Sequence, residues 1–311
     1  MKRVFPFLTL ILIAALLLPA CGPAATPTPE PTDVPLVFTD GLGRTVTLAG
    51  PAQRIVSMAP SNTEILFAIG AGSQVVGRDE FTNYPPEAME LPSIGGSMSD
   101  YNLEQIVSLN PDLVLAAEIN TPEQVKAIED LGLTVFYLNN PTELDGLYTM
   151  LETVGKLSGQ EAQVGAMVTD LRARAAAVAN ALAGIEERPS VFYELDGSDA
   201  AKPWTVGEGP FIDLLIRLAG GENVGAAMGA PYGQLSLEAL LVADPAIILL
   251  GDSNYGVTVE QVAARTGWGD LSAVQGNRVY PFNDDLVSRP GPRMIDGLEE
   301  MARIFHPDRF K

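Results

Sequence analysis

Side chains that could perform enzymatic chemistry are few and scattered in this sequence of 311 residues. The one histidine, His306, lies in a C-terminal HPDRF segment, where we expect a surface or capping residue. A serine–histidine–aspartate triad needs an imidazole beside its nucleophile, and there is no Gly-x-Ser-x-Gly elbow. Phosphate loops and histidine–cysteine clusters are absent, and the 39 acidic residues form no recognisable glycosidase pair. The sequence therefore predicts neither an enzyme nor a resident cofactor or metal.

Ligand binding is a better match for the side chains that follow the predicted strands. In two α/β lobes, the loops at the carboxyl ends of the strands meet where the lobes face each other. Aromatic side chains there supply flat apolar walls, and a guanidinium offers forked donors to amide, carboxylate or phosphate oxygens. For each residue alone, a structural role is the alternative, including a salt bridge for Arg289. The candidate ligand-binding residues are Pro60, Phe81, Tyr84, Trp204, Tyr232, Asp285 and Arg289.

A repeated stretch of sequence indicates the helices and strands that would position these side chains. Residues 102–116 read NLEQIVSLNPDLVLA and residues 236–250 read SLEALLVADPAIILL. Each copy has a capping residue, a glutamate in the first helical turn, an apolar helical face, a proline stop and an apolar run. The apolar run is typical of a buried parallel strand. The duplication predicts an α/β fold of two similar lobes.

A long helix is expected to join the lobes. Residues 160–184 contain no proline and one internal glycine, and alanine dominates their second half. The predicted domains are an N-terminal lobe over residues 36–158, a rigid interlobe helix over 159–186 and a C-terminal lobe over 187–311, with a ligand cleft between the lobes. Such a stiff connection favours small lobe movements over wide hinge closure.

The N-terminus resembles a secretory signal. Lys2 and Arg3 precede an apolar run that is short for a spanning helix, so residues 1–20 are predicted to be a signal peptide. Cys21 directly follows it, as in a bacterial lipobox, which implies cleavage before Cys21 and a diacylglycerol on its sulfur. Residues 22–35, rich in proline and threonine, complete a tether that starts at Cys21. We expect a protein anchored by lipid to the outer face of the cell membrane, a simple cleavable signal being the alternative.

The charge balance excludes one class of partner. The formal net charge is −20 at pH 7, whereas nucleic acid binding needs a basic face. An acidic surface is suited to a soluble protein that docks onto basic surfaces. We therefore expect no nucleic acid partner.

Several motifs resemble the class of periplasmic binding proteins for vitamin B12 and iron-siderophores. They are residues 54–72 (RIVSMAPSNTEILFAIGAG), residues 83–88 (NYPPEA), both copies of the repeat, and residues 288–293 (SRPGPR). The resemblance spans roughly residues 53–305 and is nearest to the B12-binding branch. It implies two lobes joined by a rigid helix, an interlobe cleft, and delivery of a ligand to an ABC importer.

Residue roles follow from this resemblance. Two glutamates of the family, one in each lobe, pair with arginines of a permease dimer, and they correspond to Glu104 and Glu238. Two cleft tryptophans of the B12-binding branch correspond to Ala117 and Met98. The resemblance implies a monomeric binding protein for a corrinoid such as cobalamin, with a ferric siderophore or haem as the alternative ligand. A surface-anchored hydrolase is a remote third reading.

Overall fold

The computed structural model describes residues 35–96 and 100–311, all within one unit, Pro35–Lys311. The predicted signal peptide, Cys21, almost all of the tether and Met98 lie outside the described residues. Within the described part of the chain, no helix has both the length and the apolar character needed to cross a membrane. The predictions for the N-terminus are therefore untested by the structure.

The first half of the unit is built on a four-stranded sheet whose neighbours all run parallel. In sheet order the strands are β4 (Val75–Arg78), β3 (Ile55–Ser57), β5 (Leu113–Ala117) and β6 (Val135–Leu138). A separate antiparallel hairpin precedes them, formed by β1 (Leu36–Thr39) and β2 (Thr45–Leu48). The helices are α2 (Pro60–Ala68), α3 (Leu103–Ser108), α4 (Pro122–Glu129) and α5 (Leu144–Ser158), with short turns η2 (Gly72–Gln74) and η3 (Pro86–Glu90).

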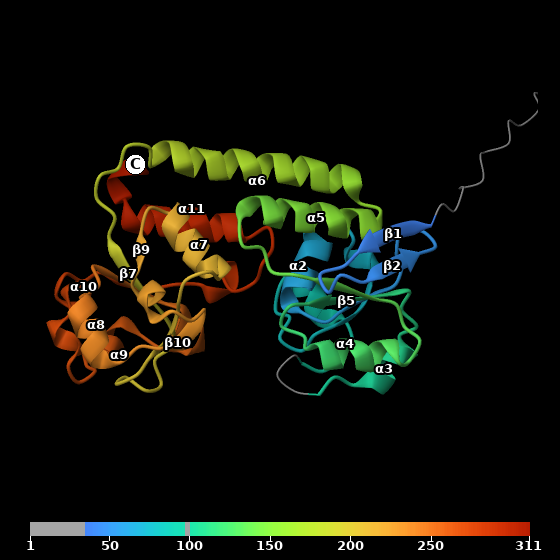
Figure 1. Cartoon of the computed structure of the whole chain (residues 1–311), viewed down its shortest axis with the longest axis horizontal. Helices are drawn as coiled ribbons and strands as arrows, with labels where there is room; N and C mark the ends of the chain where they lie inside the picture. Colours follow the sequence, from blue (N-terminus) through green and yellow to red (C-terminus); the bar gives the residue numbers. More distant parts are fainter. Residues whose placement is uncertain (1–34, 97–99) are drawn as a thin grey trace, which may run out of the picture. The chain divides into compact units, whose positions relative to one another are not determined.

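The second half has a larger, mixed sheet, in which β7, β9, β11 and β12 run parallel to one another. Strand β8 is antiparallel to β7, and β10 is antiparallel to β8. Its strands are β7 (Ser190–Asp196), β8 (Trp204–Val206), β9 (Glu222–Asn223), β10 (Tyr232–Gln234), β11 (Ile247–Leu250) and β12 (Val279–Pro281). Its helices are α7 (Phe211–Leu218), α8 (Leu237–Ala243), α9 (Val259–Ala263), α10 (Ser272–Gln275) and α11 (Met294–Phe305). Short 3₁₀ turns are η4 (Val224–Met228), η5 (Gly251–Tyr255), η6 (Trp268–Asp270), η7 (Asp284–Leu286) and η8 (Pro307–Arg309). The two sheets confirm the predicted α/β class with two lobes (Figure 1).

The repeated stretch adopts the same structure twice, as α3 followed by β5 and as α8 followed by β11. The Asn102 side chain caps α3 by accepting from a backbone N–H at 2.9 Å, and Ser236 caps α8 in the same way at 3.2 Å. Each helix is then followed within two residues by one with positive φ, 52° at Asn110 and 40° at Asp244. Asparagine and aspartate tolerate this left-handed conformation better than most residues. The duplication predicted from sequence is therefore confirmed in backbone detail.

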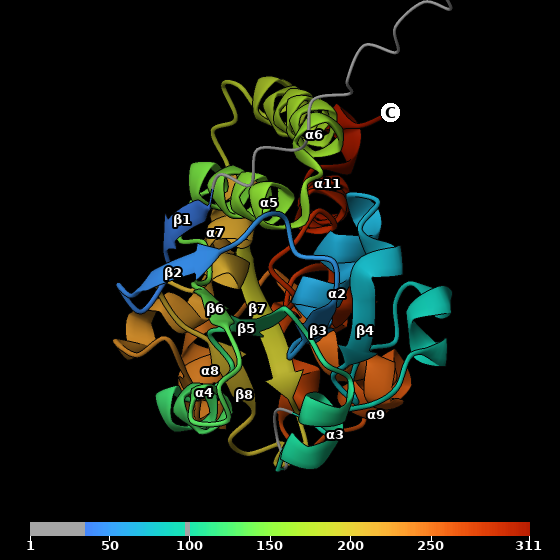
Figure 2. The same cartoon turned by 90° about the vertical axis from the view of Figure 1, so that its right-hand side faces the viewer.

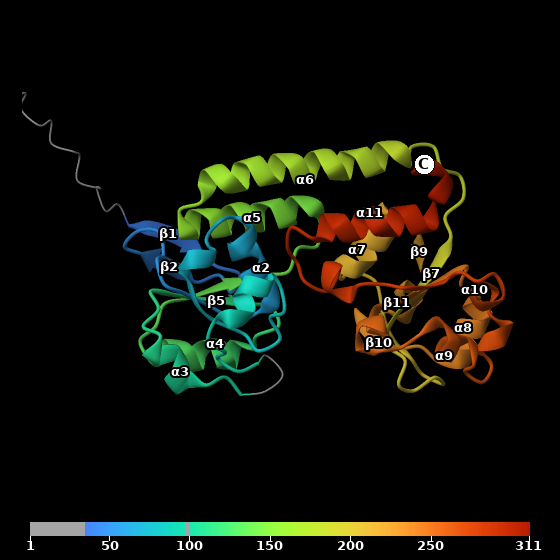
Figure 3. The ribbon, with the colours of Figure 1, turned by 180° about the vertical axis from the view of Figure 1, so that it is seen from behind.

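The long connecting helix is α6 (Glu161–Ala181), which has 21 residues and starts and ends slightly inside the predicted range. Its buried positions, Val164, Val168, Leu171, Ala175 and Val178, follow the helical period and form one stripe. Side by side with α6 lie α5 of the first half and α11 of the second (Figure 3). One apolar core includes side chains from all three helices and from α2 and α7. The lobes are therefore joined by packing as well as by the chain.

Helix α2 begins at Pro60, because proline is well suited to the first helical position, where its missing N–H has no role. His306 is the C-cap residue of α11, in agreement with the prediction of a surface or capping residue, and its Nε2 lies 3.1 Å from the carbonyl oxygen of Gly220. The side view shows both sheets and the position of α2 beside β3 and β4 (Figure 2).

Candidate ligand-binding cleft

A cavity of about 950 Å³ opens where the two halves face each other. The first half contributes residues that follow β3, β5 and β6, and the second contributes residues on β10 and after β11 and β12. These are mostly carboxyl ends of parallel strands, the usual place for ligands in α/β folds. The volume lies at the upper end of the range for small-molecule sites. The position and size fit the predicted interlobe cleft.

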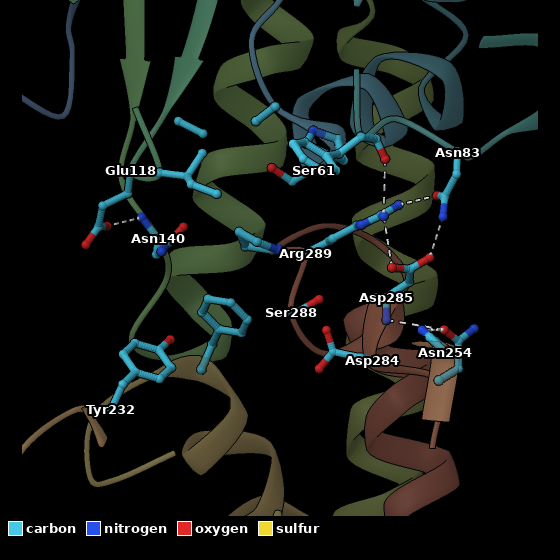
Figure 4. Close-up of a pocket in the computed structure, with 18 of the residues that line it drawn as sticks. Ser61, Asn83, Glu118, Asn140, Tyr232, Asn254, Asp284, Asp285, Ser288 and Arg289 are labelled. Atoms are coloured by element: carbon cyan, nitrogen blue, oxygen red, sulfur yellow. Dashed lines mark hydrogen bonds and ion pairs between the residues drawn. The ribbon is translucent and has the colours of Figure 1, made fainter. Parts of the chain in front are cut away.

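One wall of the cavity carries Glu118, Asn140 and Tyr232 (Figure 4). The backbone N–H of Asn140 donates to the Glu118 carboxylate at 2.7 Å, which fixes the loops after β5 and β6 to each other. Burial, together with the nearby charge of Glu118, raises the pKa of the Tyr232 phenol. Tyr232 therefore stays a neutral hydrogen-bonding group at physiological pH.

The opposite wall is a network of Asn83, Asp285 and Arg289 (Figure 4). Arg289 lies 2.9 Å from the Asp285 carboxylate and donates to the Asn83 amide oxygen at 2.5 Å. The Asn83 amide nitrogen in turn donates to Asp285 at 3.0 Å. Because Asn83 belongs to the first half and the other two to the second, this triangle bridges the cleft.

A buried carboxylate lies behind that network. Glu64, in α2, is 3% exposed and does not line the cavity. It accepts from Arg289 at 2.9 Å and from two nitrogens of Arg293 at 2.7 and 2.6 Å. A buried carboxylate with two arginine partners has the pairing that such a charge requires. The Tyr84 ring lies 4.2 Å from the Arg293 guanidinium, in cation–π geometry.

Asp284 is a cavity residue that sequence reasoning missed. Its carboxylate accepts from the Tyr193 hydroxyl at 2.7 Å, and burial raises its pKa. Asn254 and Tyr255, in η5, also line the cavity and were missed. The signal for the latter pair was present in the repeat, because η5 follows β11 as Glu118 follows β5.

The predicted ligand-binding residues divide into two groups. Pro60, Phe81, Tyr232, Asp285 and Arg289 all line the cavity. Tyr84 does not, because its ring covers Arg293. Trp204 does not either: it lies on β8, paired in register with Gln234 of β10, and its side chain is partly exposed outside the cavity lining. Ala117, at a tryptophan position of the B12-binding branch, lines the cavity.

Glu104 and Glu238 occupy the first turns of α3 and α8 and are exposed. Among residues 35–96 and 100–311, neither glutamate has a hydrogen-bond or ion-pair partner through its side chain. Within this unit α3 and α8 both lie on the side away from α6 (Figures 1 and 3). The two carboxylates are thus offered by equivalent helices on one side of the unit.

A metal centre finds no support in the described residues, where no three histidine, cysteine, aspartate or glutamate side chains are grouped to hold an ion. The cleft offers hydrogen-bonding groups, apolar walls and charge. Its chemistry is that of a ligand-binding site.

Known proteins share this organisation. The Bacillus subtilis protein called "uncharacterized ABC transporter substrate-binding lipoprotein YvrC" is 32% identical over 97% of this chain and 96% of its own. The haem-binding protein RhuT of Roseiflexus has a TM-score of 0.74 at 29% identity, covering 83% of this chain and 99% of its own. The vitamin B12-binding protein BtuF of Vibrio cholerae has a TM-score of 0.71 at 29% identity, covering 84% and 99%.

The family itself is shown by a model named "Periplasmic binding protein", which matches residues 55–286. The matched range includes both sheets and most of the cavity lining. The prediction of a solute-binding protein, rather than an enzyme, is confirmed by this match. The chain belongs to the periplasmic binding protein family.

Proposed function

We propose that this protein is the substrate-binding component of an ABC importer and carries a corrinoid of the cobalamin type in the interlobe cleft. The observation that carries the proposal is the cavity itself, at the carboxyl ends of strands from both sheets. Similarity to a protein named as an ABC transporter substrate-binding lipoprotein supports the transport role. The ligand follows from the lining of the cavity.

The lining combines apolar walls with amide groups. Pro60, Phe81 and Tyr232 supply flat apolar surface. Four asparagines also line the cavity: Asn83, Asn140, Asn254 and Asn283. A corrinoid is a broad ring with an apolar face and an edge of carboxamide arms, so its two kinds of surface match these two kinds of lining. Amide-to-amide hydrogen bonds would fix its orientation.

Haem and ferric siderophores are the alternative ligands, because the haem-binding and B12-binding relatives are equally similar in sequence. A tyrosine that ligates ferric haem does so as phenolate, and Tyr232 and Tyr255 line the cavity beside the four asparagines. The four amides match the carboxamide arms of a corrinoid, which supports the corrinoid as the first choice.

Calorimetric titration with cyanocobalamin tests the ligand directly. We expect saturable heat with one site per chain, and heat at the buffer baseline at tens of micromolar would exclude a corrinoid. Parallel titrations with haemin and with a ferric hydroxamate, followed by tryptophan fluorescence, identify which alternative holds if cobalamin fails.

Glu104 and Glu238 are proposed to dock onto basic residues of the permease dimer. Support comes from their equivalent positions in α3 and α8, their exposure, and the free carboxylates described above. The double variant Glu104→Ala with Glu238→Ala should bind ligand normally and lose transport. The matched control, Glu123→Ala with Glu260→Ala, removes exposed first-turn acids of α4 and α9 and should retain transport. Normal uptake by the docking variant would refute the role.

The membrane anchor and domain limits remain proposals as well. A lipid on Cys21 would hold the protein at the outer face of the cell membrane, with the rest of residues 21–35 as tether. Metabolic labelling with a fatty acid, lost in Cys21→Ser, tests the anchor. The division into lobes of residues 36–158 and 187–311, joined by residues 159–186, is supported by the confinement of one sheet to each side of α6.

A further inference from the structure

The acidic and basic side chains that line the cleft do not balance each other in number. Four charged side chains line the cavity, and they are Glu118, Asp284, Asp285 and Arg289. Arg289 is the one cation among them, and its side chain is 13% exposed. It is not free for a ligand, because it already contacts Asp285 and the buried Glu64.

Glu64 is the carboxylate that pairs with both Arg289 and Arg293. Its two carboxylate oxygens accept hydrogen bonds from two nitrogens of Arg293, and one of them also accepts from one nitrogen of Arg289. The two arginines are therefore matched in charge by two carboxylates, Glu64 and Asp285. Because Glu64 is enclosed, water screens these interactions weakly.

Two carboxylates are left over. Glu118 is held by a backbone N–H, and Asp284 by the Tyr193 hydroxyl. Within the described residues, neither forms an ion pair with an arginine or lysine. The cleft therefore presents acid on both walls, and its one arginine is already neutralised.

We propose that Glu64, a residue outside the cavity, sets the charge of ligand that the cleft accepts by neutralising Arg289, so that the cleft admits uncharged ligands and rejects anions. An anionic ligand group meets Glu118 and Asp284 without a free guanidinium to pair with. To recruit Arg289 it must displace a buried carboxylate that would then lose one of its two cations. A carboxamide group meets neither penalty. This inference rests on the proposed corrinoid function and names the residue responsible for its selectivity.

The first test compares two probes that differ by one charge. Cyanocobalamin has no net charge, because its cobalt–corrin cation balances its phosphodiester, and its primary carboxamide arms are uncharged. Its monocarboxylic acid derivative shares the phosphodiester and has one carboxamide arm hydrolysed, which adds one negative charge. At pH 8 the wild-type protein should bind the neutral probe more tightly. In Glu64→Gln, Arg289 loses one of its two acids and keeps Asp285, so that the two arginines outweigh their one remaining acid. The ratio of the two dissociation constants should then move toward the acid by roughly tenfold. Glu64→Asp keeps the charge and should keep the wild-type ratio.

A second test needs no corrinoid. Inorganic pyrophosphate should raise the unfolding temperature of Glu64→Gln, because Arg289 is no longer paired with Glu64 and can contact it, and should leave the wild type unchanged. The double variant Glu64→Gln with Arg289→Gln should lose the response. If Glu64→Gln does not fold, Asp285→Asn removes the other carboxylate from Arg289 and should shift both measurements in the same direction.

The outcomes separate the inference from the function. A wild type that ignores cyanocobalamin overturns the corrinoid function, and the pyrophosphate measurement still decides the role of Glu64. A wild type that binds cyanocobalamin, with unchanged probe ratios and no pyrophosphate response in the variants, overturns the inference and leaves the function standing. Tight wild-type binding of the monocarboxylic acid or of pyrophosphate also overturns the inference.

Discussion

Each half of the unit buries one glutamate, and the two are surrounded by different charges. Glu64 in α2 has two arginines, both from the other half of the chain. Glu194 in β7 has one, Arg265, from its own half, held by two hydrogen bonds of 2.5 and 2.9 Å. The same residue type therefore connects the lobes in one place and stays within a lobe in the other.

The surroundings of Glu194 are also poorer in positive charge. Asp252 lies against it, with one oxygen accepting from the Gly197 backbone N–H and the other buried without a hydrogen-bond partner among the described residues. Burial, opposed by Arg265 and reinforced by Asp252, raises the pKa of Glu194 to about 7. A buried glutamate thus becomes a proton-binding group where one arginine must serve two acids.

The largest effect expected from this comparison is the loss of Glu64. Glu64→Ala leaves two partly buried arginines with Asp285 as their remaining acid, and breaking a buried pair in this way destabilises by about 3–5 kcal/mol. Glu194→Ala should be milder, because Asp252 remains near Arg265. Urea unfolding of both variants measures the difference. Equal losses would remove the distinction between the two sites.

The second effect is a pH dependence that belongs to Glu194. Its pKa rises from an ordinary 4.5 in the unfolded chain to about 7 in the fold, so the folded state retains a proton that the unfolded chain has lost between these values. The stability contributed by that proton is complete below pH 4.5 and is lost as pH rises through 7, by ~3 kcal/mol in all.

Glu194→Gln isolates this contribution, because glutamine does not titrate. The difference in unfolding free energy between the wild type and this variant should move against the wild type from pH 4.5 to 8. Two curves that stay parallel across this range would show that the proton is not bound there.

The local features of the structure, its helix ends and strands, were predictable from sequence, because they depend on interactions between residues close in the chain. Asn102 and Ser236 indicate helix N-caps, and Pro111 and Pro245 indicate where those helices end. Residues 160–184 lack helix breakers. All of these signals act within a few residues. They were enough for the duplicated unit, the connecting helix and the α/β class.

The cleft network was beyond such signals. Arg289 and Glu64 are 225 residues apart, and nothing in their neighbourhoods says which of 39 acids an arginine will meet. The alternative of a salt bridge for Arg289 is correct, but the sequence could not say which acids would form it. Tyr84 was misplaced for the same reason: an aromatic residue in a loop can face the cavity or, as here, cover Arg293.

The smallest effect tests the role of Asp252. Asp252→Asn removes one negative charge beside Glu194 and can keep the hydrogen bond from Gly197, since an amide oxygen also accepts. Because Asp252 contributes less to the raised pKa than burial does, we expect a gain of ~1 kcal/mol above pH 7 and a shallower pH dependence. Urea unfolding at pH 5 and pH 8 separates these expectations. The variant sharpens the comparison because it removes the acid beside Glu194 and leaves the number of arginine partners as the main difference from Glu64. If Asp252→Asn instead destabilises at pH 8, the two acids do not repel each other, and the contrast with Glu64 comes from the number of arginines alone.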